Sequence, residues 1–170
     1  LPLADNLCFA VYSTALAFNA VYKPILDRLH LTYPQYLVML VLWQQDDVPV
    51  KDIGRLLHLD SGTLTPLLKR LEAIGYLARR RHTADERQLR ITLTDAGRAL
   101  ADQARSIPQG IGAACGLGWD ELGKLRDQLT QLREQLDEQR QKLLLDELNH
   151  RVKNTLATVQ SIAAQTLRHS

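Results

Sequence analysis

Residues 50–93 carry the pattern that most restricts what this chain can fold into. Two short amphipathic segments are separated by a tight connection, "HLDSG", and the second segment stops at Gly75. Pro66 implies that this second helix begins near Gly62 or Thr63, because a proline is tolerated only close to a helix start. The runs "YLARRR" and "LRITL" then read as two strands. This order predicts a winged helix-turn-helix. The stripe expected to be buried in the second helix is Leu64, Leu67, Leu68, Leu71 and Ile74.

The opposite face of that second helix is small and polar at first and basic further on. Such a face fits the major groove of DNA, while Lys and Arg side chains around it and on a projecting hairpin neutralise phosphates. A charged stretch by itself is more often a solvated surface, but the order of elements favours DNA binding as the main activity. The residues expected to contact DNA are Ser61, Thr63, Thr65, Lys69, Arg70, Arg79, Arg80 and Arg81.

The charge of the chain is small overall but unevenly spread. The formal net charge is +2, which by itself does not indicate a nucleic-acid partner. Between Lys69 and Arg98, however, eight basic residues stand against four acidic ones. The basic residues in this stretch that are not named above are Arg87, Arg90 and Arg98, and the acidic ones are Glu72, Asp85, Glu86 and Asp95.

Length and composition favour a folded protein of the cytoplasm. The chain has 170 residues and a hydrophobic content of 45%, which suits one compact domain with an extension or two small modules. No apolar run reaches the roughly 20 residues of a membrane helix, and the start "LPLADNLCFAVY" lacks the basic flank of a signal peptide. We therefore expect no membrane partner. The histidines and cysteines have no metal-ligand spacing, so we expect neither a metal nor a cofactor.

Two helices are predicted before the helix-turn-helix. Asp5 or Asn6 caps the first, which is expected to lose its regularity near Pro24. Thr32 and Gln35 have capping-box spacing and start the second, whose run "YLVMLVLW" is dense enough for a core helix.

The C-terminal third of the chain carries leucines at three-four spacing from Asp120 onward, which predicts a long dimeric helix. The spacing fails at Gln139 and Arg140 and resumes in a shifted register, which indicates a stutter or a joint. The first stripe is Leu122, Leu125, Leu129, Leu132 and Leu136, and the second is Leu145, Leu148, Val152, Val159 and Ile162.

The runs "LDSGTLTPLLKRLEAIGYLARRR", "DER" and "ITLTDAGR" resemble the MarR family of winged-helix repressors. The run "NLCFAVYSTALAFNAVYKPILDRLHLTYPQYLVMLVLW" resembles its organic-hydroperoxide-sensing branch, the OhrR type, and the similarity covers about residues 1–140. The resemblance implies a mainly α fold with a small β-hairpin wing. It implies a homodimer, joined by its first and last helices, that grips a palindromic operator in double-stranded DNA. The D-x-R pattern of the family wing falls on Asp85 and Arg87, whose guanidinium would reach the minor groove.

Cys8 is the candidate sensor residue. A cysteine among Leu7, Phe9 and Val11 is more often an inert core residue. With Asp5 as the cap, however, Cys8 lies in the first helical turn, where the helix dipole favours the thiolate that attacks peroxides. In the resembled family the matching cysteine is the peroxide sensor, and tyrosines matching Tyr22 and Tyr33 hydrogen-bond it. Tyr12, one helical turn after Cys8, is expected to join them.

Cys115, in "IGAACGLGW", resembles the second cysteine of the two-cysteine members. The resemblance then implies that the Cys8 thiolate becomes a sulfenic acid and next a disulfide with Cys115 of the partner subunit. Organic hydroperoxides are the implied effectors, and release from DNA would derepress peroxide-resistance genes. Because each thiol reacts once, this repressor is expected to be a stoichiometric sensor and not an enzyme.

The segment "ELNHRVKNTLATVQSIAAQTLR" resembles the H-box of the HWE class of histidine kinases over about residues 145–168. The resemblance implies that His150 accepts phosphate and that Glu147, Arg151, Lys153 and Asn154 shape the reacting site. No second hairpin helix, ATP box or nucleotide-binding sheet accompanies it, so a separate kinase catalytic domain or response regulator would be the partner.

We expect a MarR-like domain over residues 1–140 and an H-box helix over residues 141–170. The alternative function is the sensing and dimerising part of a histidine kinase. Three origins of the tail remain open: a piece of a longer fusion, an engineered chimera, or a natural repressor with a relic extension. The first two are favoured together over the third.

Overall fold

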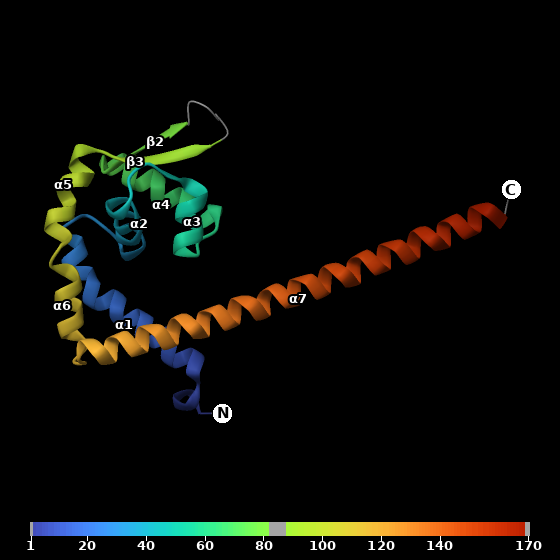
Figure 1. The fold of residues 1–170 in the computed structure, drawn as a ribbon, viewed down its shortest axis with the longest axis horizontal. Coiled ribbons are helices and arrows are strands. Elements are labelled where there is room, and N and C mark those ends of the chain that lie inside the picture. Colours follow the sequence, from blue (N-terminus) through green and yellow to red (C-terminus); the bar gives the residue numbers. More distant parts are fainter. Residues whose placement is uncertain (1, 82–87, 169–170) are drawn as a thin grey trace. The chain divides into compact units, whose positions relative to one another are not determined.

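The computed structural model describes residues 2–81 and 88–168. It divides into two compact units, Leu1–Gly116 and Leu117–Ser170. Figure 1 shows the elements of both. The first unit contains η1 (Leu3–Asp5), α1 (Leu7–Asp27), α2 (Tyr33–Gln44), β1 (Val48–Pro49), α3 (Val50–Leu57), α4 (Ser61–Ile74), β2 (Leu77–Arg81), β3 (Leu89–Leu93), α5 (Asp95–Ala104) and α6 (Ile107–Ala114). The second contains α7 (Trp119–Arg168).

Helix α2 lies at the centre of the hydrophobic core of the first unit. It begins with the predicted capping box, in which the Thr32 N–H donates to the Gln35 side chain at 2.8 Å. Val38 and Met39 are fully buried, as is Ile91 of β3. Burying one such side chain contributes about 1.5–3 kcal/mol. The core therefore ties the helix-turn-helix to the hairpin behind it.

Helix α4 buries the predicted leucine stripe only in part. Leu64, Leu68 and Leu71 are buried, Leu67 is half-buried, and Ile74 is 42% exposed, so the prediction for Ile74 was wrong. Ile74 is the last helical residue, beyond the point where α4 packs on the core.

Two predicted helix bounds can be compared with the structure. Helix α4 begins at Ser61, next to the expected start near Gly62, with Asp60 as its N-cap. Helix α1 continues through Pro24 to Asp27, so the loss of the one backbone hydrogen bond that this proline cannot donate does not end the helix.

The sheet has three strands in the order β1-β3-β2, where the sequence predicted two. Strands β2 and β3 form the antiparallel wing, with Arg79 opposite Ile91. Strand β1 is only two residues long and contains Pro49, so its sequence carries no strand pattern.

Helix α7 is continuous over 50 residues (Figure 1). The register change near Gln139 and Arg140 therefore does not break the backbone of the helix, so the predicted change is a stutter and not a joint. The expected functional boundary between residues 140 and 141 falls inside this helix and stays a prediction. Over the described residues, no helix combines the length and apolar character that crossing a bilayer requires.

Candidate nucleic-acid interface and thiol site

The outer face of α4 carries five of the predicted DNA-contacting residues. Ser61, Thr63, Lys69 and Arg70 are exposed, and Thr65 is half-buried. Asp60 caps the helix: its carboxylate accepts hydrogen bonds from the Thr63 N–H at 2.9 Å and the Thr63 hydroxyl at 3.0 Å. These hydrogen bonds, the backbone one first, lower the pKa of Asp60. The Thr63 hydroxyl is therefore already used in the cap, while Ser61, Lys69 and Arg70 remain at the surface.

The wing contains arginines of two kinds. Arg80 and Arg81 are exposed near the tip of β2. Arg79 is half-buried, and its Nε donates to Glu72 of α4 at 2.7 Å. That bond anchors the wing on α4. Asp85 and Arg87, which were predicted to form the D-x-R pattern, lie outside the described residues.

Two more basic residues of the same stretch form ion pairs with the turn that precedes β1. Arg90 of β3 donates to Asp47 at 2.8 Å, and Arg98 of α5 pairs with Asp46. Both aspartates lie in the turn between α2 and β1, more than forty positions earlier in the chain. The predicted basic region is therefore smaller as a binding surface than its residue count suggests.

Asp46 is the centre of this arrangement. One of its carboxylate oxygens accepts hydrogen bonds from the Leu93 N–H and the Asp47 N–H, both at 2.8 Å. Partial burial alone would raise the pKa of Asp46, but these hydrogen bonds and the Arg98 guanidinium together lower it below its ordinary value of 3.8. The ionised carboxylate thus links the end of β3, at Leu93, to Arg98 of α5.

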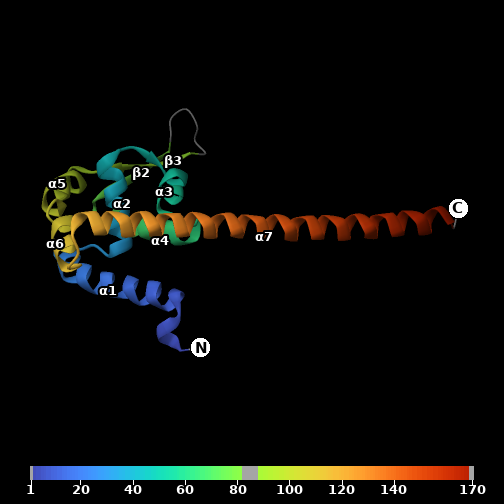
Figure 2. The ribbon, with the colours of Figure 1, turned by 60° about the horizontal axis from the view of Figure 1, so that its bottom comes forward.

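Cys8 lies in the first turn of α1, where Asn6 is the N-cap and accepts a hydrogen bond from the Phe9 N–H at 2.9 Å. Cys8 is exposed in the single chain, unlike an inert core cysteine. Tyr12, one turn further on, is also exposed. Figure 2 shows this end of α1 leading back to η1 and the N-terminus.

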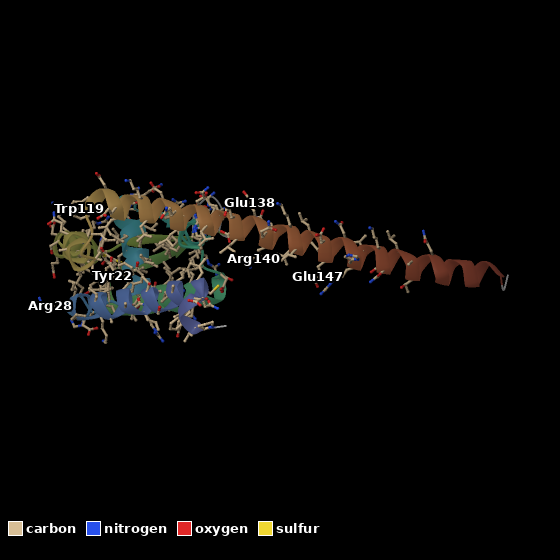
Figure 3. The ribbon with its side chains drawn as sticks, turned by 90° about the horizontal axis from the view of Figure 1, so that it is seen from below. Tyr22, Arg28, Trp119, Glu138, Arg140 and Glu147 are labelled. Atoms are coloured by element: carbon tan, nitrogen blue, oxygen red, sulfur yellow. The ribbon has the colours of Figure 1, made fainter. Side chains whose placement is uncertain are left out.

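Tyr22, near the C-terminal end of α1, forms an aromatic cluster with Tyr33 and Tyr36 of α2. The ring centroids of Tyr22 and Tyr33 are 4.7 Å apart, and those of Tyr22 and Tyr36 are 6.0 Å apart. Figure 3 labels Tyr22 in this half of α1. Tyr22, Lys23 and Tyr33 also line an open pocket of about 460 Å³.

Cys115, the C-cap of α6, belongs to the same neighbourhood. Burial first, and then negative charge on Tyr33, Tyr36 and Cys115, raise the pKa of Tyr22 to about 12. Cys115 is half-buried, and its charge acts on the Tyr22 hydroxyl.

The chain therefore gathers Tyr22, Tyr33 and Cys115 but does not bring Cys8 to them. Cys8 and Tyr22 are fourteen residues apart in one helix, which separates them by about 21 Å along its axis. Direct contact of Cys8 with these tyrosines requires a second chain.

His150 lies on α7 and is exposed, as are Lys153 and Asn154. Glu147 and Arg151, one turn apart and flanking His150, form an ion pair with each other. Figure 3 shows Glu147 pointing away from the α7 helix axis. The residues expected to shape a phosphoacceptor site thus share one stretch of the helix surface.

Comparison with known families identifies the first unit. The family described as transcriptional regulator SarA/Rot matches residues 20–104, which is half of the chain. The organic hydroperoxide resistance transcriptional regulator of Bacillus subtilis (strain 168) is 46% identical over 108 residues, covering 64% of this chain and 74% of that relative. The chain belongs to the MarR-type SarA/Rot family of transcriptional regulators.

A second relative is the HTH-type transcriptional regulator TtmR of Methylorubrum extorquens (strain PA1). It is 52% identical over 125 residues, which cover 74% of this chain. The chain spans 64% of the length of that relative.

Solved structures support the winged-helix fold. One of them is the structure of reduced AbfR, a protein of Staphylococcus epidermidis, bound to DNA. It has 40% sequence identity to this chain and a TM-score of 0.65, and the match covers 79% of this chain and 94% of that one. AbfR has also been solved in a disulfide-formed state, with a TM-score of 0.55, 38% identity and coverage of 80% and 90%. The predicted mainly α fold with a β-hairpin wing is confirmed.

A second family, described as HWE histidine kinase, matches only residues 147–170. This short match coincides with the stretch of α7 that carries His150.

Proposed function

We propose that this chain is a DNA-binding transcriptional repressor that acts as a homodimer and is released from its operator when organic hydroperoxides oxidise Cys8. The observation that carries the proposal is the placement of the two cysteines. Cys8 is exposed at one end of α1, and Cys115 lies with Tyr22 and Tyr33 at the other.

DNA binding is supported by the outer face of α4. A small polar start followed by Lys69 and Arg70 matches what the major groove and its flanking phosphates accept. Arg80 and Arg81 of the wing are placed on the same helix-turn-helix domain. AbfR, whose fold is similar, has been solved on DNA.

Dimerisation is supported by the apolar surface of α1. Large apolar side chains on more than one side of this helix remain exposed in the single chain, and exposed apolar surface of this extent normally marks an interface. These residues are Leu7, Phe9, Val11, Leu16, Phe18 and Val21. Pairing two α1 helices in opposite directions would bring Cys8 of one chain beside Tyr22 and Cys115 of the partner subunit.

The proposed chemistry consumes one hydroperoxide per pair of thiols. The Cys8 thiolate attacks the outer oxygen of ROOH, so that a sulfenic acid forms and the alcohol ROH leaves. The thiol of Cys115 in the partner subunit then displaces water from the sulfenic acid and forms the disulfide. The two sulfurs are oxidised by two electrons in total, and the peroxide bond is reduced.

Operator binding with and without cumene hydroperoxide tests the proposal. The wild-type dimer is expected to bind DNA when reduced and to release it when oxidised, while Cys8→Ser should stay bound under both conditions. Cys115→Ser should still consume one hydroperoxide but form no cross-linked dimer on a non-reducing gel. Release of DNA by the Cys8→Ser variant upon peroxide addition would rule the mechanism out.

A second candidate function is the phosphate-accepting segment of a histidine kinase. It is supported by the family match at residues 147–170 and by the exposure of His150 on a continuous helix. Phosphate transfer to His150 from a supplied kinase catalytic domain or phosphorylated response regulator, and its loss in His150→Gln, would be the expected result. No transfer from either donor would exclude this role.

A further inference from the structure

Cys115 lies directly before the connection between the two units. Its N–H donates to the carbonyl oxygens of Ile111 at 3.2 Å and Gly112 at 3.3 Å, so it closes α6. Gly116 follows with a φ of +65°, a conformation that glycine adopts without strain. The connection ends at Gly118, and the next residue starts α7. Cys115 therefore lies four positions before Trp119, the first residue of α7.

That first turn is fixed to the connection. The Gly118 N–H donates to the Glu121 carboxylate at 3.0 Å, and the Leu122 N–H donates to the Gly118 carbonyl at 3.0 Å. From Trp119 to Arg168 the helix contains no proline. A helix without such a break turns as one body when its first turn is rotated.

The two apolar stripes of α7 lie on different faces of this helix. Leu136 of the first stripe and Leu145 of the second are nine positions apart, about 2.5 turns, and so point to opposite sides. Both residues are about 60% exposed, at 62% and 60% respectively. Two α7 helices that pair along the first stripe therefore cannot continue straight into pairing along the second.

His150 lies on different sides of the two possible pairings. It follows Leu136 by fourteen positions, about 3.9 turns, and so points to nearly the same side as the first stripe. It is two positions from both Leu148 and Val152, which turns it about 200° away from the second stripe. Extending the first pairing would direct His150 toward the partner helix, and the second pairing would direct it outward.

We propose that the disulfide between Cys8 and Cys115 of the partner subunit rotates α7 and shifts the balance between its two pairings. Hydroperoxide oxidation then sets how accessible His150 is to a phosphoryl donor. The partner that packs on both stripes is a second copy of this chain. The reason is that α7 follows a unit whose exposed apolar helix α1 is proposed to pair with that same copy. This inference rests on the proposed function, since it needs the same disulfide.

The test uses the full chain and phosphoramidate, a small phosphoryl donor that needs no kinase. The rate of His150 phosphorylation is compared between the reduced protein and the cumene hydroperoxide-oxidised protein, with exposed His58 as an internal reference. A change of about fivefold or more in either direction is expected, the low end of coupling between distinct sites. Cys115→Ser should abolish the change. Equal rates in a sample whose disulfide has formed overturn the inference.

A matched pair of variants tests transmission through the helix. Gln141 is exposed between the two stripes. Gln141→Pro should break α7 there and remove the redox effect on His150 while the disulfide still forms, and Gln141→Ala should keep the effect. An undiminished effect in Gln141→Pro overturns the inference.

A non-reducing gel of the same samples separates two kinds of failure. A missing disulfide in the wild type contradicts the proposed function and this inference together. A complete disulfide with unchanged His150 reactivity contradicts only the coupling.

Discussion

Gly97 lies where α5 passes the backbone of Tyr76. A Cβ atom at Gly97 would stand 1.9 Å from the Tyr76 carbonyl oxygen, far inside contact distance. The Gly97 carbonyl also accepts a hydrogen bond from Trp43 of α2 at 2.9 Å. No side chain fits at this position, so the "DAGR" run requires a glycine there. At Gly97, α5 contacts both α2 and the segment that leads into the wing.

We expect Gly97→Ala to lower the free energy of unfolding by about 1–3 kcal/mol or more, because packed backbone must move to admit the methyl group. Gly110 of α6 is the matched control, since a Cβ there meets nothing within 4 Å. Gly110→Ala should raise stability by about 0.4–1 kcal/mol. Urea unfolding measures both. Equal effects of the two substitutions would contradict this account of Gly97.

Asp46→Ala should destabilise the first unit by about 1–3 kcal/mol, because it leaves the partly buried Leu93 N–H without its partner. The lowered pKa of Asp46 means that its contribution is complete above the ordinary value of 3.8. The contribution is lost as the pH falls through the lower folded pKa. Unfolding measured in neutral and strongly acid buffers should therefore show the variant and wild type converging in acid. A constant difference would contradict the assignment.

The pairing of Arg90 and Arg98 was not predictable from their local sequence. Within the stretch around them, basic residues outnumber acidic ones, which favoured a free basic surface. Their partners Asp47 and Asp46 come from a distant turn. A count along the chain misses ion pairs that only the fold creates.

Helix α4 is the element most open to a direct test of DNA binding. Replacing Lys69 and Arg70 together by alanine should weaken operator binding and reduce the slope of log affinity against log salt by about 0.9 for each lost phosphate contact. Exposed Lys142 on α7 supplies the control substitution, Lys142→Ala. Fluorescence anisotropy over a salt series gives both quantities. An unchanged slope in the double variant would place the interface elsewhere.

Periodic elements were predicted well and short ones were not. Helix α4, strand β3 and helix α2 are all present. Each was predicted from residues close together in the chain: a leucine stripe, an alternation of apolar residues and a capping box. Strand β1 exists only because β3 pairs with it, with Val48 opposite Ile91. Pairing between distant segments leaves no local signal to read.

At the scale of the whole molecule, we expect a second copy of the chain to cover the exposed apolar side chains of α1. Leu16 on α1 is 51% exposed. We expect Leu16→Glu to weaken dimerisation, because each copy of the interface would bury an unpaired charge. Leu56 on α3, exposed at 57%, is the control position, and Leu56→Glu should leave the dimer intact. Sedimentation equilibrium measures the association, and an equally tight Leu16→Glu dimer would exclude α1 from the interface.

The candidate thiol site shows the limit of prediction at this scale. Its residue types followed from the resemblance to a known family, and the structure gathers Tyr22, Tyr33 and Cys115. The remaining distance to Cys8 depends on a second chain, which no single sequence describes.

The uninterrupted length of α7 also has a mechanical consequence. His150 follows Trp119 by 31 positions, so the helix carries it about 46 Å from its first residue. A tilt of about 10° at the first turn would sweep His150 sideways by about 8 Å, given the rise of a straight helix. A rigid arm of this length converts a change at the scale of one bond into travel comparable with the width of a helix.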